Sequence, residues 1–377
     1  MNSVIQALVE RVIRTTDREH PADAVLRDEL KQQRGLAEVE AAVASKLTFA
    51  YFRWRGWLDV GAALRGQLDQ AWELTDKFAR HPESFSDAEL MEKTVPEWIK
   101  EEIELTPDLA RALQREPQLW LRARPGQGTA LAERLHHCRV LGEDAWSDTL
   151  VYQGREDLFK SAEFHEGAFE VQDVSSQAVG LLCDPQPGET WWDACAGEGG
   201  KLLHLSDLMR NQGLIWATDR AEWRLRKLKR RAARAKVFNY RSAVWDGGLK
   251  LPTKTKFGGI LVDAPCSGTG TWQRNPHARW TLEPRDIQEL AELQVRLLSR
   301  AASALKPGGK LLYSVCSITG SETAGVLRRL ELEAQELVPL SLRNPFDPKA
   351  AAVRSVLLLP QQVGGNGMFV AGWVRKP

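Results

Sequence analysis

Two apolar runs that each lead to a cysteine constrain this sequence more than any other feature. Ile260–Val262 leads into Asp263-Ala264-Pro265-Cys266, and Leu311–Tyr313 leads into Ser314-Val315-Cys316. Continuous apolar runs of this length are typical of strands that are buried on both faces of a parallel sheet. In open α/β sheets ligands bind outside the carboxyl ends of the strands, so both thiols and the carboxylate are expected at one binding edge. The pattern predicts a chemical site at that edge.

A second pattern indicates a nucleoside cofactor. Thr190–Asp193 reads as a strand, followed by a glycine loop from Cys195 to Lys201 and a helix that starts near Leu202. Glycines let the backbone approach a ligand closely. The next strand ends at Asp219, twenty-six positions after Asp193, where a carboxylate suits a ribose diol. The run Gly-x-Gly-Gly-Lys differs from the Gly-x-Gly-x-x-Gly of dinucleotide-binding folds, which disfavours a nicotinamide oxidoreductase.

The residues around these strands also resemble a known family. Asp263-Ala264-Pro265-Cys266-Ser267-Gly268-Thr269-Gly270, followed by Arg274-Asn275-Pro276, Trp280 and Cys316-Ser317, is similar to the Nol/Nop/Sun (NSUN) RNA cytosine-C5 methyltransferases. Within that family the chain is most similar to the RsmB-like ribosomal RNA enzymes, from about Phe164 to the C-terminus. The resemblance implies a doubly wound, Rossmann-like α/β domain that uses S-adenosyl-L-methionine.

The resemblance also implies roles for individual residues. Cys316 is expected to be the nucleophile, Cys266 to assist product release, Asp263 to hydrogen-bond the cytosine, and Lys201 to position or deprotonate. The residues expected around the cofactor are Cys195, Ala196, Gly197, Glu198, Gly199, Gly200, Lys201, Asp219, Arg224, Asp246 and Asp263. The family's usual Ala-Pro-Gly-Gly-Lys is here Gly-Glu-Gly-Gly-Lys, which places Glu198 in the cofactor loop.

The chemistry of cytosine explains why two thiols are useful. Carbon 5 is a poor nucleophile while the ring is aromatic, but a thiolate that adds to carbon 6 makes carbon 5 reactive. Enzymes that methylate exocyclic amines usually carry Asn/Asp-Pro-Pro-aromatic at this strand end and need no thiol, so Asp-Ala-Pro-Cys favours methylation of carbon. A flipped-out nucleotide is expected to contact Arg274, Asn275, Pro276, Arg279 and Trp280.

The remainder of the chain predicts two smaller parts. Residues 1–85 read as helices, because apolar residues such as Ile5, Leu8 and Val12 recur at helical spacing. The resemblance implies a reduced NusB-like module there, and an accessory domain without RNA contact is an equal alternative. Residues 86–163 read as a small α/β RNA-handling subdomain, and residues 164–377 as the catalytic domain.

Composition narrows the possible partners. The chain of 377 residues has a net charge of +1, but residues 1–160 hold 22 Lys and Arg against 28 Asp and Glu, whereas residues 161–377 hold 29 against 22. The half with the candidate site is therefore the basic one, as a polyanionic substrate favours. Five scattered cysteines without a C-x-x-C pair argue against a disulfide framework or a metal site. No apolar run approaches a membrane span, and Met1–Arg18 lacks a signal-peptide core, so a cytoplasmic protein is expected.

The sequence therefore predicts an S-adenosylmethionine-dependent RNA cytosine-C5 methyltransferase, with small-subunit (16S) ribosomal RNA as the favoured substrate and without an evident obligate protein partner. Transfer RNA is the alternative substrate. A ribosome-assembly factor that binds RNA without catalysis is the alternative class of protein, and the retained cysteines, Asp263 and Lys201 disfavour it.

Overall fold

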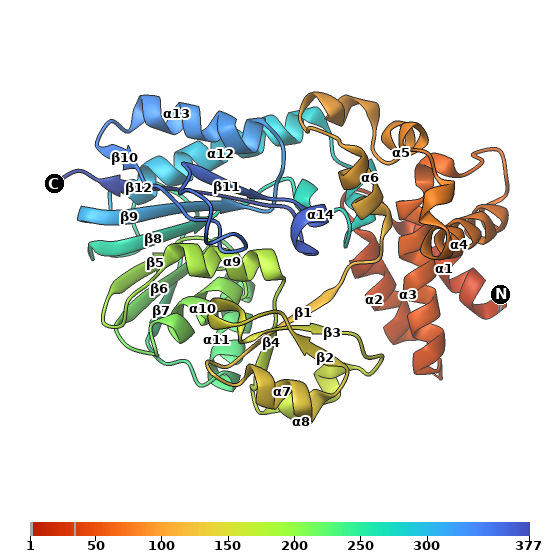
Figure 1. Ribbon diagram of the computed structural model, residues 1–377, viewed down its shortest axis with the longest axis horizontal. Helices are drawn as coiled ribbons and strands as arrows, with labels where there is room; N and C mark the ends of the chain where they lie inside the picture. Colours follow the sequence, from red (N-terminus) through yellow and green to blue (C-terminus); the bar gives the residue numbers. More distant parts are fainter. Residues whose placement is uncertain (1–2, 34) are drawn as a thin grey trace. The chain divides into compact units, whose positions relative to one another are not determined.

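The computed structural model describes residues 3–33 and 35–377, which form two compact units (Figure 1). The first unit comprises the chain up to Pro117 together with Ser267–Asp286, and the second comprises Gln118–Cys266 together with Ile287–Pro377. The segment that follows Cys266 therefore belongs with the N-terminal helices. The domain boundaries predicted after residues 85 and 163 stay predictions.

The first unit is helical. Its helices are α1 (Ser3–Thr15), α2 (Ala22–Gln32), α3 (Glu38–Arg53), α4 (Leu64–Arg80), α5 (Asp87–Lys93) and α6 (Pro107–Gln114). Ile5, Leu8 and Val12 lie on one face of α1, as their spacing predicts, and are buried together with Leu47 of α3 and Leu68 of α4. This apolar cluster accounts for the helical N-terminal region that the sequence predicts.

The second unit is built on a large mixed sheet. Its strands are β5 (Thr190–Asp193), β6 (Leu214–Asp219), β7 (Tyr240–Val244), β8 (Phe257–Asp263), β9 (Leu305–Val315), β10 (Leu337–Pro339), β11 (Ser355–Leu358) and β12 (Met368–Arg375). The order is β10-β12-β9-β8-β5-β6-β7, and β11 also pairs with β12. Strands β5 to β9 run parallel, whereas β12 is antiparallel to β9. The doubly wound fold that was predicted is confirmed.

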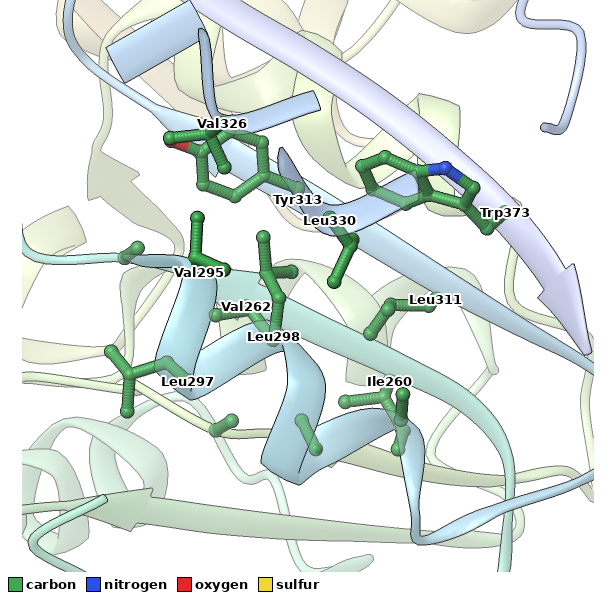
Figure 2. Close-up of a cluster of buried hydrophobic side chains, with 14 of the residues drawn as sticks. Ile260, Val262, Val295, Leu297, Leu298, Leu311, Tyr313, Val326, Leu330 and Trp373 are labelled. Carbon is green, nitrogen blue, oxygen red and sulfur yellow. The ribbon is translucent and has the colours of Figure 1, made fainter. Parts of the chain in front are cut away.

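Helices cover both faces of this sheet. Figure 1 shows α12 (Pro284–Ala302) and α13 (Val326–Glu333) on one face, and α9 (Val174–Cys183), α10 (Gly200–Leu208) and α11 (Glu222–Arg234) on the other. Ile260 and Val262 point toward α12 and α13 (Figure 2), whereas Leu261 between them belongs to the apolar cluster of the opposite face. The continuous apolar runs of the sequence are thus explained by burial on both sides.

One predicted boundary differs from the structure. The amphipathic pattern from Asp286 onward predicts a helix that continues to Leu305, but α12 ends at Ala302 and Leu305 already begins β9. Leu305 is buried in the same apolar cluster as the last turn of the helix, so its position in the pattern could not distinguish helix from strand.

A smaller antiparallel sheet precedes the large one in the second unit. It has the order β2-β3-β1-β4, with strands β1 (Leu119–Ala123), β2 (Cys138–Val140), β3 (Thr149–Tyr152) and β4 (Phe169–Val171). The short helices α7 (Gly128–Leu135) and α8 (Ala162–His165) accompany it, and α14 (Pro360–Val363) lies near the C-terminus. The small sheet with its helices is the α/β part of this region, and the bounds of the subdomain stay a prediction. Helix α7 ends at Leu135, and Cys138 already pairs with Tyr152 as the first residue of β2.

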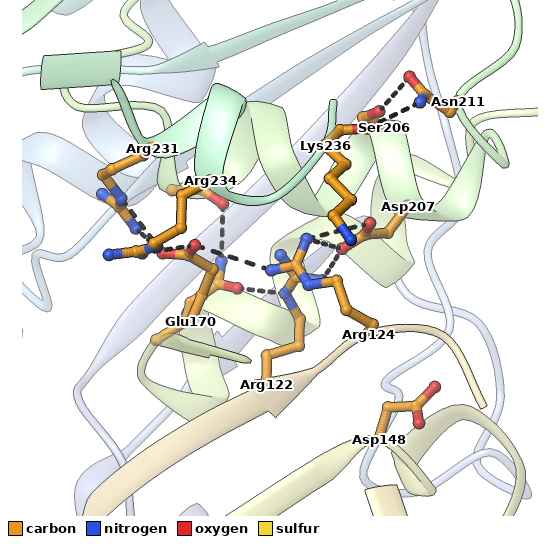
Figure 3. Close-up of polar contacts among 12 residues, drawn as sticks. Arg122, Arg124, Asp148, Glu170, Ser206, Asp207, Asn211, Arg231, Arg234 and Lys236 are labelled. Carbon is orange, nitrogen blue, oxygen red and sulfur yellow. Dashed lines mark hydrogen bonds and ion pairs between the residues drawn. The ribbon is translucent and has the colours of Figure 1, made fainter. Parts of the chain in front are cut away.

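Buried charges link the small sheet to the helices of the large one (Figure 3). Glu170 of β4 is 1% exposed and accepts hydrogen bonds from Arg231 and Arg234 of α11, both at 2.8 Å. Burial raises the pKa of Glu170, but the two guanidinium groups outweigh it and hold the pKa below its usual value. Asp207 of α10 likewise pairs with Arg122 and with Arg124 at 3.2 Å. Two of the many basic residues of α11, Arg231 and Arg234, are therefore paired within the protein.

Among the described residues, every helix is too short or too polar to cross a membrane.

Candidate active site

A cavity of about 510 Å³ opens at the carboxyl ends of the parallel strands. Asp193, Asp219 and Asp263 each end a strand and line the cavity, and Asp246 follows β7 and lines it too. Every residue predicted for catalysis or cofactor binding lines this cavity except Gly199. The position follows from the parallel order of the sheet, because the loops after β5, β6, β7, β8 and β9 all leave at one edge.

The two predicted thiols meet at this edge. The Sγ atoms of Cys266 and Cys316 are 3.3 Å apart, longer than the roughly 2.05 Å of a disulfide bond. The register of the strands explains the meeting, because Asp263 at the end of β8 pairs with Ser314 of β9. Each cysteine follows that aligned pair by two or three residues, so the two loops bring the sulfur atoms together.

Asp263 is held on both oxygens beside the thiols. Its Oδ2 accepts a hydrogen bond from Lys201 Nζ at 2.7 Å, and its Oδ1 accepts one from Ser314 Oγ at 2.8 Å. Burial lowers the pKa of Lys201, but the carboxylate of Asp263 outweighs burial and raises it above the ordinary value. Lys201 is therefore an ammonium ion at neutral pH. This charge favours the positioning role over the deprotonating one.

Asp193 is a buried acid whose two oxygens have no well-formed hydrogen bond. It is 0% exposed, and no donor in the described part of the chain meets both the distance and the angle of a hydrogen bond to them, although the backbone N–H of Cys195 is close enough to lower the pKa of the group. Burial, together with the negative charge of Asp263, raises its pKa to about 8. An unpaired carboxylate costs free energy when it is buried in a protein, so its place in the cavity wall fits a cationic ligand group.

The glycine loop has the geometry that a cofactor cradle needs. Gly197 has a φ of +54°, and the space where a Cβ would project is open. Its N–H donates to Asp219 Oδ2 at 3.0 Å, so loop and second strand are locked together. Glu198, which stands where the family usually has proline, pairs with Lys227 at 2.7 Å. A side chain at Gly199 would meet Leu228, so helix packing requires a glycine there, and its contact with the cofactor stays a prediction.

Comparison with known proteins identifies the family of the chain. Residues 180–374, about half of the chain, match the family described as 16S rRNA methyltransferase RsmB/F. The chain belongs to this family. The RsmB-like resemblance predicted from the sequence is thereby confirmed.

Individual relatives extend the comparison. The chain is 37% identical over 216 residues to a probable ribosomal RNA small subunit methyltransferase B of Synechocystis, covering 55% of this chain and 48% of that protein. It is 34% identical over 219 residues to the probable enzyme of the same name from Bacillus subtilis, covering 56% and 49%. The chain spans about half the length of these curated relatives. The crystal structure of PH0851 has the same fold, with a TM-score of 0.79 at 24% identity over 98% of this chain and 97% of that one.

Several residues that line the cavity of this RsmB/F-family protein were not predicted. They include Ser176 of α9, Trp245 after β7, and Leu293 and Leu297 of α12. The two leucines continue the apolar stripe of α12, so a sequence pattern assigns them to the core. Ser176 belongs to a segment that resembles the family, but its residue type carries no signal of its own.

The loop expected to hold a flipped nucleotide requires one correction. Arg279 is 0% exposed, and its guanidinium donates to the backbone oxygens of Leu113 and Trp272 and to Gln114 Oε1. It fastens the segment after Cys266 to α6 within the first unit, so it is a structural residue rather than a phosphate ligand. Trp280 is also anchored there, because its Nε1 donates to the Phe52 oxygen at 2.7 Å.

Proposed function

We propose that the protein is an S-adenosylmethionine-dependent RNA (cytosine-C5) methyltransferase that acts on small-subunit ribosomal RNA. The observation that carries the proposal is the 3.3 Å approach of Cys266 and Cys316 beside the Lys201–Asp263 pair. A thiolate that adds to carbon 6 makes carbon 5 able to take a methyl group, and a second thiol beside it can assist release of the product. Methylation of an exocyclic amine needs neither thiol. The curated relatives named as small-subunit ribosomal RNA methyltransferases support the choice of RNA.

The residues of the cavity fit S-adenosylmethionine. Asp193 would accept a hydrogen bond from the ammonium group of the methionine half. The open space at Gly197 would admit the rest of that methionine half. Asp219 would accept the ribose hydroxyls, and Trp245 and Asp246 would face the adenine. When bound, this cofactor supplies a sulfonium methyl group that a carbon nucleophile can take.

Cys316 is assigned the role of nucleophile. Its sulfur lies within the field of the Lys201 ammonium, whose pKa the cysteine helps to raise, and a neighbouring positive charge favours a thiolate. The thiolate forms a bond to carbon 6 of cytosine, and the displaced electron pair moves through the ring to the ring nitrogen N3. Asp263 accepts from the exocyclic amine, and Lys201 offsets the charge that develops on the ring. Carbon 5 then takes the methyl group.

Release of the product requires a second group. After methyl transfer, carbon 5 carries both a proton and the new methyl group, and removal of the proton breaks the bond between carbon 6 and sulfur. We assign this step to Cys266, the other sulfur at the reacting edge. The Cys316 thiolate is regenerated, and the 5-methylcytosine leaves.

Two variants test the assignment on RNA transcripts. Cys316→Ala should abolish methylation and form no covalent adduct, whereas Cys266→Ala should accumulate a protein–RNA adduct that survives a denaturing gel. Cys138→Ala is the matched control, because this thiol lies in the small sheet outside the cavity and should leave activity unchanged. If both variants of the paired cysteines stay active, the assigned roles fail.

The substrate is tested in cells. Bisulfite sequencing of RNA from a strain that lacks the protein should show one unconverted cytosine of 16S ribosomal RNA becoming convertible. Loss of a site in transfer RNA instead would identify the alternative substrate. An unchanged RNA population, together with RNA binding by the purified protein, would identify a non-catalytic assembly factor.

A further inference from the structure

A polar network lies behind the two cysteines, inside an otherwise apolar core. Gln294 of α12, Tyr313 of β9 and Glu322 are each 0% exposed. Figure 2 shows the ring of Tyr313 among apolar side chains such as Val295 and Val326. Glu322 belongs to a short π-helical turn, Ser321–Gly325, that precedes α13. Such turns are rare in proteins, and those that occur often lie at functional sites.

Gln294 connects this network to the loop that carries Cys266. Its Nε2 donates to the backbone oxygen of Pro265 at 2.9 Å and to Glu322 Oε1 at 2.9 Å. Its Oε1 lies 2.8 Å from the Tyr313 hydroxyl, whose single proton also faces the Glu322 backbone oxygen at 2.6 Å. The two acceptors of Nε2 fix the orientation of the amide. Pro265 is the residue immediately before Cys266, so the amide holds the backbone from which that thiol projects.

Glu322 connects the same network to the loop that carries Cys316. Its Oε2 accepts hydrogen bonds from Ser317 Oγ at 2.6 Å and from Thr319 Oγ1 at 3.0 Å. Ser317 is the residue immediately after Cys316. A continuous path of hydrogen bonds therefore runs from Pro265 through Gln294 and Glu322 to Ser317, and it joins the two backbone segments that carry the thiols.

Stability alone does not explain such a network. Burial of a carboxylate and an amide costs free energy, and apolar side chains of similar volume are often as stable or more stable. Satisfied polar networks do specify one arrangement, because each partner has few alternatives in a low-dielectric core. The paired cysteines are what this arrangement holds in place.

We propose that Gln294 and Glu322 are positioning residues that set the separation of Cys266 and Cys316, so that one cytosine is within reach of both sulfur atoms. The proposal rests on the proposed two-thiol function. Neither residue lines the cavity, so both act through the backbone of the cysteine loops. Displacement of a reacting group by about 1 Å can lower a rate on the order of 100-fold.

The test compares two substitutions on one helix. Gln294→Met keeps the approximate shape of the side chain and removes both amide donors. Leu298→Ala, one helical turn further along α12, removes a buried apolar group that lies outside the cavity and has no part in the network. Measurements on each full-length variant are kcat, KM for S-adenosylmethionine, thermal unfolding, and the fraction of protein trapped on RNA in a denaturing gel.

Gln294→Met should lower kcat on the order of 100-fold, leave KM for S-adenosylmethionine near that of the wild type, and accumulate a covalent adduct like Cys266→Ala. Leu298→Ala should lower the unfolding temperature without forming an adduct. If Gln294→Met does not fold, as judged by calorimetry with S-adenosylmethionine, Glu322→Gln takes its place and should accumulate adduct at a smaller loss of kcat.

Two results would overturn the positioning role. One is wild-type turnover in both Gln294→Met and Glu322→Gln. The other is a loss of activity without adduct in these variants, in proportion to a loss of stability like that of Leu298→Ala. Failure of the proposed function is distinguishable from either, because Cys266→Ala would then form no adduct and Cys316→Ala would still methylate RNA.

Discussion

The unpaired carboxylate of Asp193 predicts a pH dependence of cofactor binding. The cofactor's ammonium group would pair with the ionised carboxylate, but burial raises the pKa of Asp193 to about 8 in the protein without ligand. Below that pH most molecules carry a neutral carboxylic acid at this position and must lose its proton on binding. Affinity for S-adenosylmethionine should therefore rise as pH increases from 6 to 7.

The magnitude follows from the ionised fraction. A group with a pKa of about 8 is ionised in about 1% of molecules at pH 6 and about 9% at pH 7, so the association constant should increase about ninefold over this unit, or about 1.3 kcal/mol. An α-amino group has a pKa of about 7.7–8.0, so the ligand itself keeps its charge across this window.

Isothermal titration calorimetry at pH 6.0, 6.5 and 7.0 measures the effect, and Asp193→Asn is the matched variant because it cannot titrate. For the wild type, the association constant should rise with pH by the predicted factor. Close to one proton should be released per cofactor bound, which is measured by repeating the titration in buffers of different ionisation enthalpy. The variant should show a flat profile and no such release. Equal slopes in the two proteins would refute the role of Asp193.

Further predictions concern the other charged and thiol groups. Lys201→Met should lower kcat on the order of 100-fold, because a paired Asp263 is left without its cation, whereas Lys201→Arg should retain more activity in the same methylation assay. Glu170→Gln should reduce the free energy of unfolding by about 3–5 kcal/mol at pH 7, because Arg231 and Arg234 lose their buried partner. Since the pKa of Glu170 is lowered in the folded protein, its contribution is present above the pKa of an unfolded glutamate and is lost as pH falls, so urea unfolding of wild type and variant should converge toward acid pH. Hydrogen peroxide should join Cys266 and Cys316 in a disulfide, with release of two waters and loss of activity. Dithiothreitol should then restore activity. A Cys266→Ala protein that shows the same reversible loss would contradict this pairing.

Much of the fold could be predicted because local pattern and tertiary burial agree. The runs at Ile260–Val262 and Leu311–Tyr313 are apolar at every position, and burial on both faces of a parallel sheet is what requires this. The glycine loop predicts a strand–loop–helix unit, because few other structures require several glycines at this spacing. By contrast, the end of α12 could not be read, because Leu305 satisfies the apolar pattern of a helix as well as that of β9.

The candidate site was predictable where chemistry requires a particular residue type. A cysteine or an aspartate at a strand end is informative, and Cys316, Cys266 and Asp263 were identified for that reason. Arg279 was expected to contact a flipped-out nucleotide because it follows the Cys266 loop, yet its burial depends on partners more than 160 positions away in the sequence. The role of Gln294 depends on contacts with residues 28 and 29 positions distant, which no spacing rule covers.

The two-sulfur mechanism can be tested most directly with RNA that contains 5-fluorocytidine at the target, because fluorine at carbon 5 cannot leave as a proton and the adduct is trapped. Digestion of the wild-type complex and mass spectrometry should place the methylated nucleotide on the peptide that contains Cys316. A nucleotide on the Cys266 peptide, or full turnover without any adduct, would contradict the mechanism.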